Sequence, residues 1–367
     1  MPMASKTAFP THIDKIIERI NNIDPVKYAH TRNYTDGAVT YLSPYISRSV
    51  ISVKQVLENV VSRGYDPQKI EKFIQELCWR EYWQRTWQAA GDLIYTDLKN
   101  PQSGVEHNRL PNSILAAETG IEIIDKHILQ LYETGYMHNH VRMYLASICC
   151  NIGKAHWSTP AAWMYYHLLD GDLASNTLSW QWVAGSFSSK KYYCNQDNIN
   201  HFTGSQQKGT FMDHDYDHIM RMPLPDQLSK QTDPELAATL PITDFPVINR
   251  SLPTLVYNSY NLDPGWRKEE PANRILLLEP SHFNKFPVSE KVIRFIISLS
   301  ENIPGIQVFT GEFRELAPAC AEIISKEHPA FAHYSGKKEE RDWISKGKTG
   351  YEQSFSLFWK KTRKDIF

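Results

Sequence analysis

Carboxylate, amide and indole side chains gather in one short stretch, Asp170-Gly-Asp-Leu-Ala-Ser-Asn-Thr-Leu-Ser-Trp-Gln-Trp182. Asp170 and Asp172 follow an apolar helical pattern, and Asn176, Trp180 and Trp182 come after them. Carboxylates can hold a sugar or a cationic side chain, and indoles can pass electrons. A plain connection between helices would need none of these groups. The stretch therefore predicts a site for a planar, polar, redox-active ligand.

A second group of such side chains lies on a predicted helix over residues 68–90. Spacings of three, four and seven residues place much of this group along one stripe, and its members are Glu76, Trp79, Arg80, Trp83 and Trp87. An aromatic stripe alone is typical of a helix that packs into a core. The carboxylate and the guanidinium favour a functional face, because charges are rarely buried without a partner.

The elements that must position these residues are predicted to be helical from residue 13 to residue 169. Ser52 with Gln55 forms a capping box, and Asp66 with Pro67 marks the start of the next helix. No alternating strand pattern interrupts this region. The first half of the chain is therefore expected to be an all-α domain.

The second half changes character twice. Periodicity fades between residues 184 and 270, where prolines punctuate an extended connection. Strands are then predicted at 274–279 and 306–310, helices at 292–299 and 318–326, and a third strand at 331–334. We therefore expect a mainly α fold, with an all-α domain (1–190), an irregular segment packed on it (191–270) and a small α/β unit (271–367).

Composition narrows the class of protein. The net charge of −1 argues against a chain that is basic overall, although a local basic groove is compatible with it. No apolar run reaches the ~18 residues that span a bilayer. The five cysteines include no C-x-x-C pair, which indicates reduced thiols in a cytoplasmic protein. The segment Asp213–His218 could bind a metal, but a solvated turn is the preferred interpretation, and no metal is expected.

Five segments, in this order, resemble the DNA photolyase and cryptochrome family. They are Tyr28-x-x-x-Arg32, Thr40-Tyr-Leu-Ser-Pro-Tyr45, Glu76-Leu-Cys-Trp-Arg-Glu81, Gly135-Tyr-Met-His-Asn-His-Val-Arg-Met143 and Asp170–Trp182. The resemblance covers about residues 28–182 and implies the flavin-binding helical domain of that family. It also makes a flavin site the preferred interpretation of Asp170 and Asp172, over the metal and sugar-nucleotide chemistry that such a pair serves elsewhere.

The resemblance implies FAD as the cofactor. Tyr28, Thr40, Leu42 and Ser43 would hold its pyrophosphate, which suits hydroxyls beside a helix start. Arg142 and Asp170 would form a buried ion pair beside the isoalloxazine ring, and Asn176 would face flavin N5, where a neutral amide favours the reduced anionic form. The full expected set of cofactor residues is Tyr28, Thr40, Tyr41, Leu42, Ser43, Phe73, Arg142, Asp170, Gly171, Asp172 and Asn176.

The same resemblance implies a pyrimidine-dimer pocket. Trp79 would stack on a flipped dimer, while Glu76 and Asn139 would hydrogen-bond the pyrimidine edges. An asparagine at 139 favours cyclobutane dimers over (6-4) photoproducts, for which a histidine would be expected there. The expected DNA-contacting set is Arg32, Glu76, Trp79, Arg80, Asn139, His140 and Met143.

Trp180 and Trp157 would be the first two members of the tryptophan relay that photoreduces the flavin. The third is missing, since residues 104–107 contain no tryptophan, and Trp163 or Trp87 are candidate substitutes. The resemblance begins close to the N-terminus, so the family's N-terminal antenna domain and its chromophore are expected to be absent.

The leading hypothesis is a monomeric, light-driven lyase that repairs cyclobutane pyrimidine dimers in DNA, with Glu76, Asn176, Trp157 and Trp180 in its chemistry. A cryptochrome-like blue-light sensor without repair activity is the alternative, favoured by the missing third tryptophan and the near-neutral charge. A third interpretation has the aromatic stripes packing a helical bundle without flavin.

Overall fold

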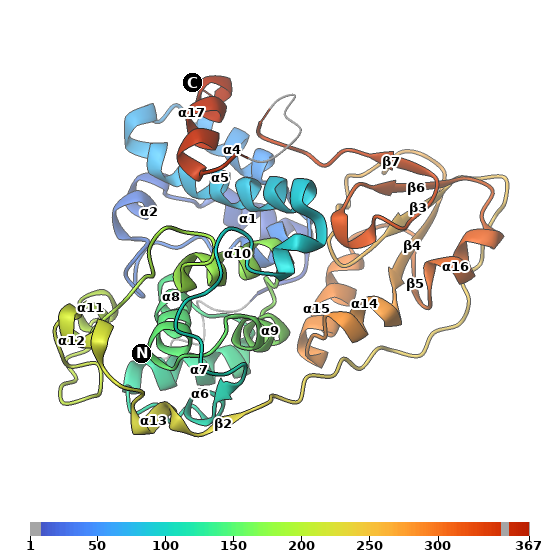
Figure 1. The fold of residues 1–367 in the computed structure, drawn as a ribbon. Coiled ribbons are helices and arrows are strands. Elements are labelled where there is room, and N and C mark those ends of the chain that lie inside the picture. The colour runs from blue at the N-terminus through green and yellow to red at the C-terminus, as the bar shows by residue number, and fades with distance from the viewer. Residues whose placement is uncertain (1–8, 346–351, 367) are drawn as a thin grey trace. The chain divides into compact units, whose positions relative to one another are not determined.

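The computed structural model describes residues 9–345 and 352–366 (Figure 1). The chain splits into two compact units. The mixed unit takes in Met1–Pro25, Thr40–Ala89 and Leu236–Phe367, and it contains helices and a parallel sheet. The helical unit takes in Val26–Val39 and Ala90–Glu235. The protein is mainly α with a small α/β part, as the sequence predicts.

The helical unit consists of helices and one very short ladder. In chain order its elements are α2 (Pro25–Thr31), a 3₁₀ turn (Gly91–Tyr95), β1 (Leu110–Pro111), α6 (Asn112–Ala116), α7 (Glu122–Thr134), α8 (Asn139–Ala146), a π-helical turn (Ser147–Ile152), α9 (Ser158–His167), α10 (Leu173–Ala184), α11 (Gln196–Thr203), α12 (Tyr216–Arg221), α13 (Asp226–Ser229) and β2 (Gln231–Thr232), which pairs with β1.

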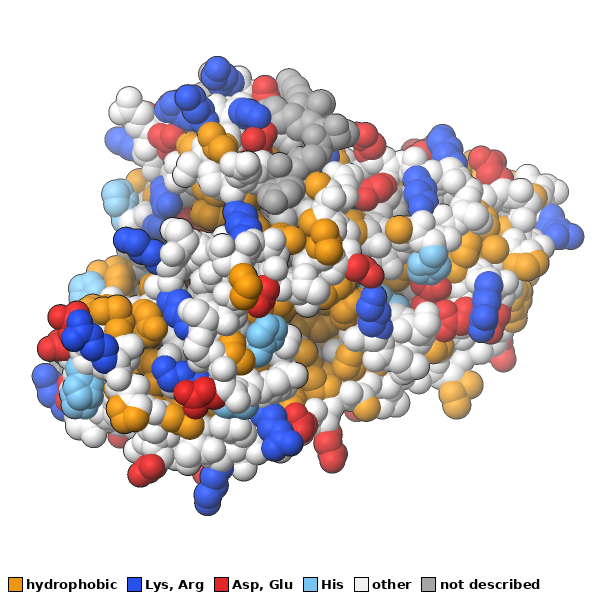
Figure 2. Space-filling model, viewed as in Figure 1, with side chains coloured by type: hydrophobic (Ala, Val, Ile, Leu, Met, Phe, Trp, Pro, Cys, Tyr) orange, Lys and Arg blue, Asp and Glu red, His pale blue; other side chains and the backbone are white. Residues whose placement is uncertain are grey.

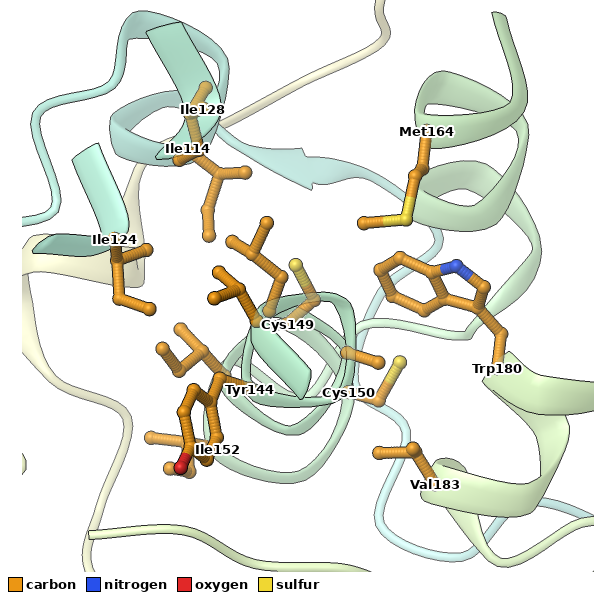
Figure 3. Close-up of a cluster of buried hydrophobic side chains, with 14 of the residues drawn as sticks. Ile114, Ile124, Ile128, Tyr144, Cys149, Cys150, Ile152, Met164, Trp180 and Val183 are labelled. Atoms are coloured by element: carbon orange, nitrogen blue, oxygen red, sulfur yellow. The ribbon is translucent and has the colours of Figure 1, made fainter. Parts of the chain in front are cut away.

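The core of the helical unit surrounds the π-helical turn after α8. Figure 3 shows Cys149 and Cys150 on that turn, with Tyr144, Met164 and the indole of Trp180 around it. These side chains are at most 3% exposed. Burial raises the pKa of the Cys149 thiol, so it stays protonated and behaves as a small apolar side chain. The candidate electron-relay residue Trp180 is thus held by close packing.

Gly135 lies at the end of α7, close to the segment that follows α9. It ends α7 in the left-handed conformation, with φ of 71°. A Cβ atom there would lie 2.6 Å from Cγ of Leu169, so a larger residue would displace the segment before α10. The glycine lets the start of α8 approach the end of α9.

The mixed unit begins with α1 (Ile13–Asn21), α3 (Ser43–Ser47), α4 (Val53–Val61) and α5 (Pro67–Ala90). The predicted capping box of α4 is confirmed, because Ser52 Oγ accepts from Gln55 N at 3.0 Å and Gln55 Oε1 accepts from Ser52 N at 2.9 Å. Asp66 Oδ1 accepts from Gln68 N at the start of α5. On α5, Trp83 and Trp87 are core residues, at 7% and 1% exposure.

Five parallel strands follow in the order β5-β4-β3-β6-β7. They are β3 (Thr254–Tyr257), β4 (Asn273–Leu278), β5 (Ile306–Thr310), β6 (Ile323–Lys326) and β7 (Lys337–Glu339), and Figure 1 shows α14 (Pro280–Lys285), α15 (Glu290–Ser300) and α16 (Phe313–Leu316) beside them. Starting from β3 in the centre, the chain places β4 and then β5 on one side of it. It then crosses to the other side, where it places β6 and then β7. This reversal is typical of a doubly wound sheet.

Three sequence predictions for this sheet are wrong. Residues 318–326, predicted as a helix, contain the end of a 3₁₀ turn (Ala317–Ala319) and then β6, whose Ile323 and Ile324 pair with β3. Residues 331–334 form no strand, because a 3₁₀ turn (Pro329–Phe331) occupies their start. The α/β unit also begins before residue 271, because β3 is the central strand of its sheet.

The C-terminal helix α17 (Phe355–Ile366) lies against α5. Phe355 and Phe358 contact Tyr82, and Arg363 Nε lies 3.0 Å from Glu71 Oε1. Figure 2 shows basic side chains gathered over α17, which contains Lys360, Lys361, Arg363 and Lys364. In the part of the chain that the structure describes, no helix is long and apolar enough to cross a membrane.

Glu339 ties the edge strand β7 to the loop that follows β3. It accepts from Arg267 Nη2 at 2.7 Å and from Trp266 Nε1 at 2.9 Å. The hydrogen bond from Arg267 is the main cause that lowers the pKa of Glu339 to about 2. Because the folded pKa lies below the ordinary value, the pair stabilises the fold fully above about pH 4.5 and loses its effect as the pH falls towards 2.

We therefore expect Glu339→Gln to destabilise the mixed unit by about 2 kcal/mol at pH 7, a value reduced for the partial exposure of the pair. Urea unfolding followed by far-UV circular dichroism measures this. Glu340→Gln, at the exposed neighbouring position, is the control and should unfold like the unmodified protein. Equal unfolding midpoints for the two variants would contradict the stabilising role of Glu339.

Candidate functional site

An ion pair in the helical unit joins α8 to the segment before α10. Nη2 of Arg142 lies 3.1 and 2.9 Å from the two carboxylate oxygens of Asp170, and its Nε donates to Met137 O at 2.9 Å. The side chain of Asp170 is 5% exposed and that of Arg142 is 20% exposed. The predicted pairing of these two residues is present, and it sets a cation and an anion at fixed positions.

The next two residues shape the start of α10. A Cβ atom at Gly171 would lie 3.0 Å from Leu168 O and 3.2 Å from the ring of Tyr165, so the glycine permits close packing at this turn. Asp172 caps α10, because its Oδ1 accepts from Ser175 N at 2.7 Å. The hydroxyl of Ser175 is buried and has no hydrogen-bond partner among the residues that the structure describes. A buried hydroxyl of this kind is available to a polar ligand.

Asn176 has a fixed orientation. Its Nδ2 donates to Ala161 O at 2.9 Å, and no residue in the described ranges donates to its Oδ1. The amide is therefore held by its nitrogen and presents its oxygen as a free acceptor. This is the geometry expected of a side chain that receives a hydrogen bond from a bound ligand.

The predicted phosphate-binding turn lies in the mixed unit. Tyr41 has a φ of 53°, an uncommon conformation for a large side chain, and Arg19 Nη1 donates to its carbonyl oxygen at 3.2 Å. Leu42 N donates to Thr40 Oγ1 at 3.4 Å. The helix α3 starts at Ser43 without a side-chain cap, so the Ser43 hydroxyl makes no hydrogen bond to any residue that the structure describes. Ser43 thus remains available to a ligand.

The predicted lesion residues of α5 have protein partners. The Glu76 carboxylate lies 3.5 Å from Lys72 Nζ. Trp79 stacks face to face on Phe355 of α17, with ring centroids 3.8 Å apart and planes 9° apart. Phe73 is 2% exposed and belongs to the core, while Arg80 is half-buried. The Trp79 ring is therefore covered on one face by an aromatic ring of this chain.

The predicted lesion residues of the helical unit lie on α8 and, for Arg32, directly after the end of α2. Asn139 is exposed at the first position of α8, and Met143 follows one turn later on the same face. Burial is the main cause that lowers the pKa of His140 to about 4, and the charge of Arg32 lowers it further. Because α8 also contains Arg142, one helix joins the predicted DNA-contacting residues to the predicted flavin-contacting pair.

The relay residues Trp157 and Trp180 belong to the same core cluster and are 2% and 3% exposed. Trp182 is half-buried and contacts Tyr192. Trp163, a candidate third relay residue, is fully buried, and its Nε1 donates to Tyr132 at 3.2 Å. Sequence reasoning missed two residues beside Trp157, Asp97 and Gln102, because they lie more than 50 residues from it in a loop without periodicity.

The structure divides the predicted residues between the two units. The mixed unit contains Thr40, Tyr41, Leu42, Ser43, Phe73, Glu76, Trp79 and Arg80, and the helical unit contains Tyr28, Arg32, Asn139, His140, Arg142, Met143, Trp157, Asp170, Gly171, Asp172, Asn176 and Trp180. The helical unit alone offers a fixed ion pair, a fixed amide and a buried unpaired hydroxyl. This donor set fits the ring and the ribityl chain of FAD.

One family model and several relatives are similar to this chain. Residues 73–232 match the family model described as the FAD binding domain of DNA photolyase. Over 169 residues, the chain is 31% identical to the deoxyribodipyrimidine photo-lyase of a Synechococcus strain. The aligned residues make up 43% of this chain and 35% of the relative. Over 154 residues, it is 31% identical to the Agrobacterium fabrum protein of the same name, covering 41% and 32%.

A Synechocystis cryptochrome is similar in structure, with a TM-score of 0.46 and 22% identity, over 53% of this chain and 44% of that one. The chain spans about a third of the length of the two photo-lyases. The matched region contains Arg142, Asp170 and Asn176, and the cofactor is FAD. Residues 73–232 of the chain are thus similar to the FAD binding domain of DNA photolyase.

Proposed function

We propose that this protein repairs cyclobutane pyrimidine dimers in DNA by a light-driven electron transfer from reduced FAD. The observation that supports the proposal most is the composition of α8. This helix presents Asn139 and Met143 on one face and holds Arg142 in its pair with Asp170. A residue that contacts the dimer and a residue that contacts the flavin are thereby kept one helical turn apart.

Each of these side chains has a definite task in the proposal. Arg142 and Asp170 orient the cofactor, and the fixed amide of Asn176 accepts a hydrogen bond from it without offering an acidic proton. Asn139 and Glu76 bind the pyrimidine edges, while Arg32 and Arg80 attract the DNA backbone. When bound in its reduced form, FAD supplies the electron that opens the cyclobutane ring under blue light.

The test is repair of a thymine-dimer oligonucleotide by the FAD-loaded, anaerobically reduced protein. We expect dimers to disappear under blue light and to persist in the dark, with tighter binding to damaged than to undamaged DNA. Equal binding to both oligonucleotides and no loss of dimers would refute the proposal.

One observation favours the alternative function, a blue-light sensor without repair activity. Phe355 occupies a face of Trp79 on which a flipped pyrimidine would stack. The two rings are nearly parallel, as a base and an indole would be. A protein that never binds a dimer could keep this contact permanently, whereas a repair enzyme must release it.

Two substitutions distinguish these cases. In a repair enzyme, Trp79→Ala should weaken dimer binding by ~1–3 kcal/mol through lost stacking, and Phe355→Ala should tighten it by roughly tenfold by uncovering Trp79. Leu357→Ala, at an exposed position of α17, is the control. Fluorescence anisotropy with a labelled dimer oligonucleotide measures all three. Unchanged affinity in both aromatic variants would assign Trp79 to the core.

A further inference from the structure

A carboxylate contacts the buried indole of Trp157. Trp157 is 2% exposed, and its Nε1 donates to Asp97 Oδ1 at 2.7 Å. The side chain of Asp97 is 23% exposed, so this carboxylate extends from the core to the solvent. The donor–acceptor distance lies within the range that permits direct proton transfer.

The loop that holds Asp97 is fastened at several points. Asp97 Oδ2 accepts from Gln102 N at 2.8 Å, and Gln102 in turn accepts from Trp157 N and donates to Ala155 O, both at 2.9 Å. Leu98 N donates to Gln181 Oε1 on α10 at 3.0 Å. The carboxylate and the indole are therefore held together by backbone contacts as well as by their own hydrogen bond.

A histidine continues the path from Asp97 to the solvent. His156 Nε2 lies 3.4 Å from Asp97 Oδ1, and the side chain of His156 is 27% exposed. The His156 ring also packs beside the Trp157 ring, with centroids 5.3 Å apart. A proton that leaves the indole thus has an acceptor at contact distance and a second titratable group beyond it.

The other tryptophans of the helical unit lack this arrangement. The structure describes every residue from 90 to 235, and in that range no indole besides that of Trp157 donates to a carboxylate. Trp163 donates to a tyrosine hydroxyl, and Trp180 Nε1 donates to no residue within 9–345 and 352–366. Within residues 90–235, the indole with a carboxylate partner is therefore that of Trp157, where the predicted tryptophan relay ends.

We propose that Asp97 is the proton acceptor that makes Trp157 the terminal electron donor of the relay, in place of a third tryptophan. The inference rests on the proposed role of Trp157 and Trp180 in photoreduction. Trp157 gives one electron to the oxidised flavin of bound FAD by way of Trp180, and its Nε1 proton moves to Asp97 Oδ1. One electron and one proton leave the indole, which becomes a neutral radical, and the carboxylate becomes a carboxylic acid.

Physical chemistry supports this assignment. An indole that has lost an electron carries a positive charge in a buried place, where an unpaired charge is costly. Transfer of the proton to Asp97 removes that charge from the ring. Return of the electron then requires return of the proton, so the separated charges last longer. A relay with only two tryptophans needs such a trap, because the second indole is buried and cannot release its proton to water directly.

Transient absorption of the oxidised, FAD-loaded protein tests the proposal, since neutral and cationic indole radicals have different spectra. We expect the neutral radical in the unmodified protein, and the cationic radical in Asp97→Asn with a lifetime shortened roughly 100-fold. Deuterated solvent should slow the conversion of the cationic radical to the neutral radical, and only in the unmodified protein. Trp157→Phe identifies the signal, and Asp97→Glu, which keeps a carboxylate, should retain the neutral radical.

The controls separate proton transfer from a structural role. Asp92→Asn, at an exposed position nearby, removes one charge without touching Trp157. If Asp97→Asn gives the same radical spectrum and lifetime as the unmodified protein, Asp97 only satisfies the buried indole N–H. If Asp97→Asn does not fold, the unmodified protein still tests the proposal. A neutral radical that forms there at the same rate in deuterated and ordinary solvent contradicts the proposal. Because repair is assayed on chemically reduced protein, its failure is distinguishable from failure of the relay.

Discussion

Asp170→Asn is expected to yield a folded protein that purifies without FAD and is less stable by about 3 kcal/mol, because it leaves the largely buried Arg142 without its counter-charge. Arg142 would keep its hydrogen bond to Met137 O but lose the negative charge and one of its two acceptor oxygens at residue 170. The flavin absorbance of the purified protein and its urea midpoint report the two effects separately.

The control for this variant is Asp233→Asn. Asp233 pairs with Arg109 at 3.3 Å, but both side chains are more than half exposed, so loss of this pair should leave stability and flavin content unchanged. Retention of FAD by Asp170→Asn at reduced stability would show that the pair only supports the fold. An unchanged unfolding midpoint would contradict the proposed energetic role of the pair.

Mild acid is expected to unfold the helical unit. Burial is the main cause that lowers the pKa values of three histidines, to about 4 for His127, about 3 for His138 and about 4 for His140. Their folded pKa values lie below the ordinary histidine value of 6.5, so below that pH the unfolded chain binds more protons than the folded one. Stability is therefore constant above pH 6.5 and falls as the pH drops towards 4.

The slope of this loss is steep, because three histidines together can contribute about 4 kcal/mol per pH unit. Over one or two pH units this matches the whole stability of an ordinary domain. His127→Leu should reduce the slope by about a third, whereas a substitution at the exposed His30 should leave it unchanged. Urea midpoints between pH 8 and pH 4.5 measure the slope. A midpoint independent of pH in this range would contradict the buried, neutral state of the three rings.

Local signals predicted the helices between residues 13 and 169 well, because such helices are stabilised by contacts within a few residues. The capping box at Ser52 and the start of α5 at Pro67 follow from such contacts. The strands β3 and β6 were missed because each is only four residues long. Their conformation is set by pairing with neighbours distant in sequence, which short-range patterns do not contain.

The same distinction holds for the site. Asp170, Asp172 and Asn176 are close in sequence, so their chemistry was visible as a motif. The partner of Asp170 is 28 residues away and was expected only through the family resemblance. Asp97 and Trp157 are 60 residues apart in the sequence, and neither composition nor periodicity predicts their contact. The Phe355 ring on Trp79 likewise depends on the docking of a helix from the other end of the chain.

The most direct test of the proposed function measures flavin and repair in one sample. The purified, FAD-loaded protein is reduced without oxygen, mixed with an excess of thymine-dimer oligonucleotide and divided between blue light and darkness. We expect bound FAD in the absorption spectrum and more dimers repaired than protein molecules present, in the light only. Bound FAD with an unchanged number of dimers after illumination would contradict the proposed repair function and favour the sensor.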